Sequence, residues 1–136
     1  MTYVAAKSLD RAGFEVYVSD ASPLNMTRPS RAVRGFDRTP SAFKEPASYV
    51  EALAEIIKRR KIDLLLPGHE DVFSIQAHAA VLPPNVIVAA PPYAELCFAA
   101  DKLHIMRVAE NVGVTVPRTL EVLSFDELVA GANQLG

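Results

Sequence analysis

The sequence alternates short apolar runs with longer amphipathic segments, and this alternation restricts the fold more than any other feature. Runs rich in β-forming residues predict strands at 14–20, 32–37, 62–67 and 85–91. Helical spacing of apolar residues predicts helices at 3–12, 46–61, 70–81, 93–100, 101–112 and 124–136. Strands that alternate with helices in this way predict an α/β fold with an open, mostly parallel, doubly wound (Rossmann-like) sheet.

The start of the predicted fold is unusual, because the first segment is a helix. A Rossmann-like unit normally begins with a strand that lies in the middle of its sheet. We therefore expect the first strand to be missing from the sheet, which leaves open edges. Open edges invite pairing with another chain, so a homo-oligomer, such as a dimer that fills the gap, is expected.

Composition limits the classes of function. The chain has 136 residues, a net charge of −2 and 50% hydrophobic residues, which suits one globular domain and does not suit nucleic-acid binding. Prolines interrupt every apolar stretch before it reaches membrane-spanning length, and residues 1–11 lack the pattern of a signal peptide. The single cysteine, Cys97, fits a reducing compartment, and its apolar neighbours predict burial. A soluble, cytoplasmic protein without a membrane or nucleic-acid partner is expected.

Ligands of open α/β sheets bind beyond the carboxyl ends of the strands, which here are followed by polar residues. Asp20 follows the first predicted strand, where it either binds a ribose or starts the turn at 21–23; no GxGxxG precedes it, which favours the turn. "PGHEDV" (67–72) follows the next clear strand. There, Glu70 or Asp71 starts and caps the next helix, or His69 and Glu70 face the crevice and hold a polar substrate, and both interpretations stay open.

The sequence lacks a complete set of catalytic or metal-binding residues. His69, His78 and His104 have no metal-ligand spacing with cysteine or acidic clusters, so no metal site is expected. No P-loop, nucleophile motif or paired carboxylates are present, and no catalytic residue is assigned. A fragment of an NAD(P)-dependent oxidoreductase is disfavoured by the missing glycine fingerprint.

Residues 101–119, "DKLHIMRVAENVGVTVPRT", carry a family resemblance. A "DK" that opens a helix, followed by "GVTVPRT", resembles the ATP-grasp superfamily of ligases. "SLDRAGFEVYVSD" (8–20), "IIKRRKIDLLLPGHEDVFSI" (56–75) and "VIVAAPPYAELCFAADK" (86–102) are similar to preceding family segments and stand in the same order. The resemblance implies a pre-ATP-grasp Rossmann-like domain at 1–100. Residues 101–136 would form a linker helix and the start of the ATP-grasp domain, in a carbamoyl-phosphate-synthase-like branch.

What the resemblance implies about activity is specific. Family enzymes use ATP and magnesium to activate a carboxylate for attack by an amine, and Lys102 matches a residue that reaches an ATP phosphate in some members. Otherwise Lys102 is an exposed lysine at a helix start. The lobes that clamp ATP in the family have no counterpart in 1–136. The chain is therefore expected to be inactive and to bind no cofactor by itself. It would be either a fragment of such a ligase or a reduced relative. A stand-alone Rossmann-like module that binds a small metabolite or a protein, without catalysis, is the alternative.

Overall fold

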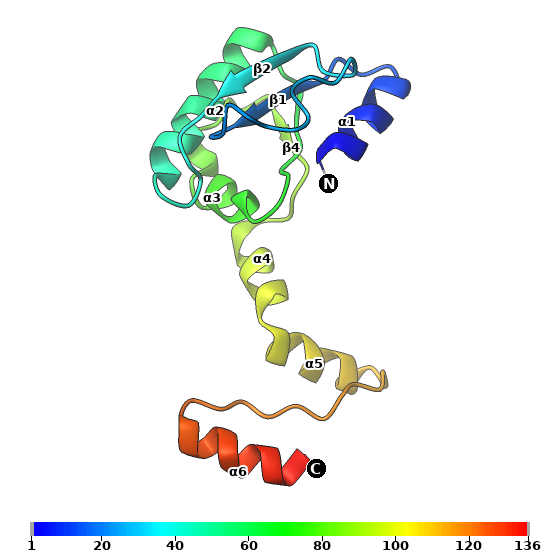
Figure 1. Ribbon diagram of the computed structural model, residues 1–136, viewed down its shortest axis with the longest axis vertical. Helices are drawn as coiled ribbons and strands as arrows, with labels where there is room; N and C mark the ends of the chain where they lie inside the picture. Colours follow the sequence, from blue (N-terminus) through cyan, green and yellow to red (C-terminus); the bar gives the residue numbers. More distant parts are fainter. Residues whose placement is uncertain (1, 136) are drawn as a thin grey trace. The chain divides into compact units, whose positions relative to one another are not determined.

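The computed structural model describes residues 2–135, with the side chains of residues 2–133, as an α/β protein made of two compact units (Figure 1). The first unit extends to Tyr93 and the second begins at Ala94. The sequence placed its boundary near residue 100 instead, and the assignment of the second part to a further domain stays a prediction.

The first unit opens with a helix that leads into a parallel pair of strands. Helix α1 (Thr2–Arg11) ends before Gly13, whose φ of 91° suits a residue without a side chain. The chain then forms β1 (Tyr17–Asp20) and β2 (Gly35–Arg38), which pair in parallel with Tyr17 opposite Gly35. Ala6 of α1 packs with Val16 and Val18, so α1 covers one face of β1.

The second half of this unit also combines helices with a parallel pair of strands, and its first helix is longer than α1. Its elements are α2 (Pro46–Arg60), β3 (Leu64–Leu65), α3 (Asp71–Ala77), the 3₁₀ turn η1 (Ala79–Val81) and β4 (Ile87–Val88). Strands β3 and β4 pair in parallel. Proline at the first turn of α2 is tolerated because that amide has no intrahelical partner.

Helix α2 supplies most of the core. It contributes the buried residues Tyr49, Val50, Leu53, Ala54, Ile56 and Ile57. Most of this stripe packs with Ile75 of α3 and Leu82, and partly buried Leu65 and Val88 of β3 and β4 lie against it. Arg60 lies over the ring of Tyr17, at 5.1 Å from its centroid, so α2 also meets the face of β1 opposite α1. Helices on both faces confirm the predicted α/β, Rossmann-like class.

The strands of the first unit do not form one continuous sheet. The strands form two separate two-stranded parallel sheets, β1–β2 and β3–β4. The run at 62–67 is predicted as a strand over its whole length, but only residues 64 and 65 are in strand conformation, and Leu64 and Leu66 are 38% and 48% exposed. The expected missing strand accounts for both findings, because β3 has a partner on one side only.

The second unit is helical in the described residues. Its helices are α4 (Tyr93–Ala100, whose first residue closes the first unit), α5 (Lys102–Asn111) and α6 (Phe125–Leu135). Asp101 caps α5 by accepting the amide of His104 at 3.1 Å. Ser124 precedes α6 and accepts the amide of Glu127 at 3.2 Å, as in one half of a capping box, while the Glu127 carboxylate accepts the amide of Leu123 at 2.7 Å. Cys97 of α4 is exposed, so its expected burial is wrong.

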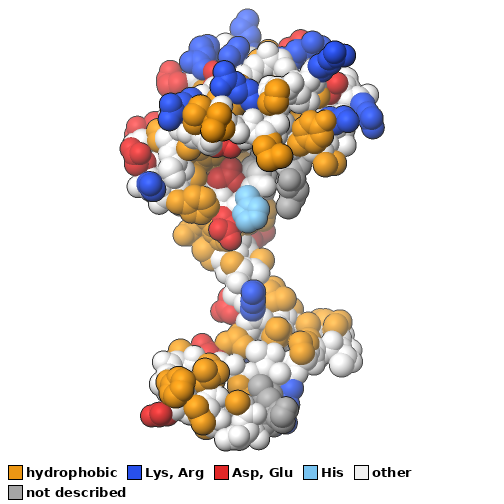
Figure 2. Space-filling model, in the orientation of Figure 1, with side chains coloured by type: hydrophobic (Ala, Val, Ile, Leu, Met, Phe, Trp, Pro, Cys, Tyr) orange, Lys and Arg blue, Asp and Glu red, His pale blue; other side chains and the backbone are white. Residues whose placement is uncertain are grey.

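Two surface features bear on function. Basic side chains gather over the end of the first unit where α2 ends, mixed with acidic and hydrophobic ones (Figure 2). Arg59 and Arg60, the last two residues of α2, are paired with Asp37 at 2.7 and 3.1 Å, as is typical of a solvated helix end. None of the described helices combines the length and apolar character needed to cross a bilayer.

Candidate functional site

The carboxyl ends of β1 and β3 lie at a common edge of the first unit. Asp20 is the last residue of β1, and Asp71 begins α3 just after β3. Both carboxylates act on Tyr49, in the first turn of α2, and help to raise the pKa of its hydroxyl. The polar residues that follow two different strands are therefore close together, as expected for an open α/β sheet.

Asp71 organises the turn after β3. Its Oδ1 accepts the amide of His69 at 2.8 Å, and its Oδ2 accepts the hydroxyl of Tyr49 at 3.1 Å. Burial raises the pKa of the Tyr49 hydroxyl, and the charge and hydrogen bond of Asp71 add to this effect. Tyr49 therefore stays protonated as a donor, and it anchors the turn to the core through α2.

The two predicted substrate residues of this turn project from the anchored backbone. His69 and Glu70 are both exposed, and the structure records no hydrogen bond from either side chain to another described residue. The expected side-chain cap of the following helix is not formed, since Glu70 at the N-cap position makes no side-chain cap bond and Asp71 accepts an amide of the preceding turn instead. His69 and Glu70 thus remain accessible to a ligand, and their substrate role stays a prediction.

Asp20 is engaged by its own turn. Its Oδ1 accepts the amide of Ser22 at 2.7 Å, and its Oδ2 accepts the side-chain amide of Asn25 at 2.5 Å. This is the geometry of the turn interpretation. Asn25 in turn accepts the amide of Thr27 at 2.7 Å, so the polar loop after β1 is held by side-chain bonds. A ligand that used Asp20 would compete with these donors.

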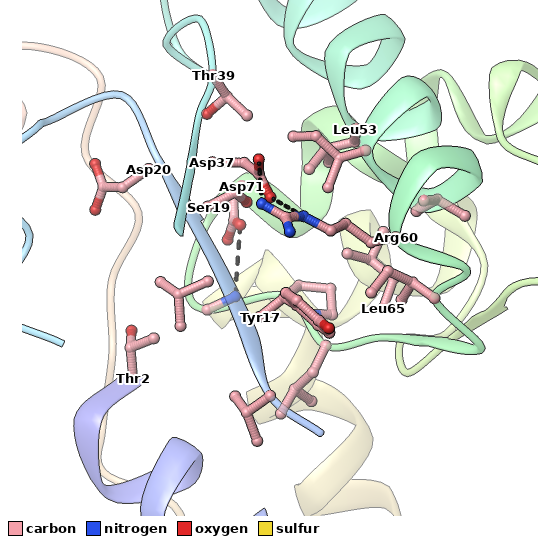
Figure 3. A pocket seen from close by; sticks show the side chains of 18 of the residues that line it. Thr2, Tyr17, Ser19, Asp20, Asp37, Thr39, Leu53, Arg60, Leu65 and Asp71 are labelled. Atoms are coloured by element: carbon pink, nitrogen blue, oxygen red, sulfur yellow. Dashed lines mark hydrogen bonds and ion pairs between the residues drawn. The ribbon is translucent and has the colours of Figure 1, made fainter. Parts of the chain in front are cut away.

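A cavity of about 940 Å³ lies between the two half-sheets, and we call it the inter-sheet cavity. Its lining runs from Thr2 to Asp71 and includes residues of α1, β1, α2 and β3, several of which converge in Figure 3. One lining side chain, Thr39, follows β2 and is 6% exposed, and its hydroxyl has no hydrogen-bond partner among the described residues. Such a buried hydroxyl is costly unless something satisfies it.

Lys102 belongs to the second unit. It is the first residue of α5, directly after the cap Asp101, and it is exposed. A cation at the start of a helix is unfavourably placed against the helix dipole. Both interpretations of Lys102, as a phosphate-binding residue and as an exposed lysine at a helix start, stay open. The phosphate contact that the family resemblance implies for Lys102 stays a prediction.

The two other histidines have structural surroundings. The Nδ1 of His78 lies 3.0 Å from the carbonyl oxygen of Ser74, one turn earlier in α3. The ring of His104 meets the ring of Phe98 edge-on, with centroids 4.0 Å apart. Among residues 2–135, no group of three or more histidine, cysteine and acidic residues is arranged to hold a metal ion.

The sequence did not reveal the residues that fix this edge. Tyr49 lies among the apolar residues whose helical spacing predicts the helix at 46–61, and nothing in that spacing indicates that its hydroxyl reaches Asp71. Thr39 lies in a stretch without helical or strand periodicity. The one available signal was the pair Glu70-Asp71 at a helix start, which allowed either residue to act as the anchor.

Comparison with known proteins bears on the fold. No protein-family model and no curated protein matches the chain. Among solved structures, the chain is similar to the biotin carboxylase domain of a single-chain bacterial carboxylase, with a TM-score of 0.62 and 17% identity. The similarity covers 98% of this chain, which spans 31% of the length of that one. At this identity the likeness establishes the fold, in agreement with the predicted Rossmann-like α/β arrangement.

Proposed function

We propose that the chain is the N-terminal, substrate-side domain of an ATP-dependent carboxylate–amine ligase of the ATP-grasp superfamily. The observation that carries the proposal is the similarity of fold along 98% of the chain to a biotin carboxylase domain. The order of the sequence segments from 8 to 119 supports the same family independently. Within the ATP-grasp superfamily, the sequence motifs favour the carbamoyl-phosphate-synthase-like branch. The similar solved structure makes a biotin-dependent carboxylase the main alternative.

In this proposal the edge after β1 and β3 forms one wall of a substrate site. His69 and Glu70 are exposed on a turn whose backbone is held by Asp71 and Tyr49. A positioned histidine can donate to a carboxylate or carbonyl of a polar substrate, and the nearby Glu70 can accept from an amine or hydroxyl. Asp20 lies at the same edge, and its contribution to the substrate site is to stabilise the turn that follows β1.

ATP and magnesium would act mainly through other parts of the complete enzyme. The described residues offer no cluster of metal ligands, so they do not fit a magnesium site, and no step of the reaction is assigned to them. Lys102 is the one residue proposed to reach a nucleotide phosphate, as a point charge at the start of α5. The chain itself would shape the substrate side and support the linker helix.

Calorimetry with Mg-ATP tests this division of roles. Residues 1–136 alone are expected to show no micromolar binding, and micromolar binding would contradict the proposal. In a longer polypeptide that adds ATP-binding lobes, Lys102→Ala should weaken nucleotide affinity by about tenfold, as for loss of one charge-assisted contact. Lys58→Ala, an exposed lysine of α2, is the matched control and should leave the affinity unchanged.

The alternative function is a Rossmann-like binding module without catalysis. The accessible His69 and Glu70 beside a cavity of about 940 Å³ favour it, because a pocket of that size suits a small metabolite. The genomic reading frame separates the two functions. Coding sequence that continues past Gly136 into glycine-rich strands supports the ligase, and a stop codon without a neighbouring ATP-grasp gene supports the module.

A further inference from the structure

Helix α1 lines two different cavities with two different faces. Its inner face, which includes Ala6, packs against β1 and lines the inter-sheet cavity. Another face, together with residues 29–32 of the loop before β2, lines a second cavity of about 370 Å³, which we call the α1–loop pocket. Among the described residues, the two cavities have no lining residue in common.

The charged side chains that line the α1–loop pocket are mainly basic. Lys7 and Arg11 stand one turn apart on α1, so they lie on the same face of the helix. Arg31 lines the pocket from the loop, and Asp10 contributes a carboxylate. Three cations and one carboxylate give this lining two net positive charges at neutral pH.

These charges are not neutralised within the part of the chain that the structure describes. The ion pairs recorded there belong to the end of α2, and none includes a residue of this pocket. The ammonium of Lys7 lies over the ring of Tyr3, 5.4 Å from its centroid, which positions the charge without cancelling it. Arg11, in the last turn of α1, also complements the helix dipole, but Lys7 and Arg31 have no such role. An anion bound between the three cations would relieve their repulsion.

The loop side of the pocket is held in place by the fold. Ser30 Oγ accepts the amide of Ala32 at 3.3 Å, and the Ser30 carbonyl accepts the amide of Val33 at 3.1 Å. Ala32 is 6% exposed, so the backbone next to Arg31 is anchored in the protein. The backbone of Arg31 is therefore positioned beside α1 before a ligand binds, and this preorganisation lowers the cost of binding.

The arrangement suits a phosphate group better than a carboxylate. A phosphate dianion balances two net positive charges, and its oxygens can accept hydrogen bonds from donors on both α1 and the loop. A carboxylate has one charge and two oxygens for three cations. The volume of about 370 Å³ lies within the range of small-molecule sites, so the phosphate can belong to a larger molecule. Asp10 can then accept a hydroxyl of that molecule.

We propose that the α1–loop pocket binds the phosphate group of a small molecule. The guanidinium groups of Arg11 and Arg31 hold the phosphate through paired N–H donors, and Lys7 adds a point charge. Free phosphate and a phosphate monoester share this chemistry, and the experiment below separates them.

Backbone amide chemical shifts of residues 1–136 test the proposal during a titration with inorganic phosphate. Sodium chloride keeps the ionic strength constant, so that loose attraction to surface charge is screened throughout. The amides of Arg31 and Ala32 should shift and saturate with a Kd of about 1 mM or lower. No saturation by about 10 mM phosphate would overturn the proposal.

Two further probes identify the ligand. Acetate should bind at least about tenfold more weakly than phosphate, and equal affinity for acetate would overturn the assignment to phosphate. Glycerol phosphate supplies the same group as an ester. Tighter binding than inorganic phosphate would identify a monoester as the ligand, and equal binding would identify the free ion.

Variants with opposite expected effects locate the site. Arg31→Ala should weaken phosphate affinity by about tenfold, as for loss of one charge-assisted contact. Arg34→Ala is the matched control, because Arg34 is also exposed but does not line the pocket. Asp10→Asn should strengthen the affinity by about two- to fivefold, since it removes a repelling carboxylate. Equal affinities of Arg31→Ala and Arg34→Ala, or weaker binding by Asp10→Asn, would overturn the proposal.

The outcome is independent of the proposed ligase function. The pocket includes none of the residues proposed for the substrate edge, Asp20, His69 and Glu70, and the titration contains no nucleotide. The expected affinity of about 1 mM is also far weaker than the micromolar nucleotide binding that calorimetry tests.

Discussion

Helices α2 and α5 show how similar sequence patterns reach different structural roles. Both are amphipathic, and both were recognised from the spacing of their apolar residues. Helix α2 buries six residues against the strands and α3, whereas α5 buries none in the described structure. A periodic apolar stripe therefore establishes that a helix has a face to bury, while the presence of a partner decides whether that face is buried.

The largest effect that tests this comparison comes from a matched pair of isoleucines. Ile57 of α2 is 4% exposed and Ile105 of α5 is 39% exposed. Ile57→Ala should lower the free energy of unfolding by about 2–5 kcal/mol, because a cavity remains in the core. Ile105→Ala should change it by less than about 0.5 kcal/mol. Urea denaturation measures both, and a comparable loss for Ile105→Ala would show that α5 is buried against a partner in solution.

An intermediate effect is expected at Tyr49, which gives α2 a polar anchor that α5 lacks. Tyr49→Phe removes the hydrogen bond to Asp71 and should lower the free energy of unfolding by about 1.5–3 kcal/mol at neutral pH. Tyr3→Phe, which removes an exposed hydroxyl, is the control and should stay within about 0.5 kcal/mol.

The pH dependence of the same variant follows from the raised pKa of Tyr49. Its ordinary pKa is near 10, and its pKa is higher in the folded protein. The stabilisation is therefore complete below pH 10 and is lost as pH rises toward the folded pKa. The difference in stability between the parent chain and Tyr49→Phe should shrink between pH 9 and pH 11. A difference that stays constant over this range would contradict the proposed role of the buried hydroxyl.

The smallest effect concerns the cap of α5. Asp101→Ala removes the acceptor for the amide of His104 and should destabilise this helix by about 0.5–2 kcal/mol. Exchange of the His104 amide should accelerate, while the core amides of Val50 and Leu53 keep their rates. Acceleration in both places would mean that the two units unfold together.

Much of the first unit was predictable because local patterns decide it. Alternating apolar residues identified β1, and the helical spacing of apolar residues identified α2. Each of these depends on neighbours within about one helical turn or a few strand residues. The lengths of β3 and β4 were not predictable in this way, because a strand persists only where it has a partner.

The candidate site was predictable only in part. The sequence located Asp20 and the turn at 67–72 at strand ends, where the structure places them. It did not indicate that Asp71, rather than Glu70, holds the turn, nor that Tyr49 reaches across 22 residues to bond it. Those contacts depend on how α2 lies across the strands, and no local pattern records that.

The sequence by itself determined the α/β class and the order of the elements, because apolar periodicity and helix capping act over short distances. Only the tertiary structure decided that the remaining strands divide into two half-sheets with facing free edges. It also decided that helices cover both sides of the space between them. These features arise from pairing and burial between segments far apart in the chain, so they appear only when the whole unit is assembled.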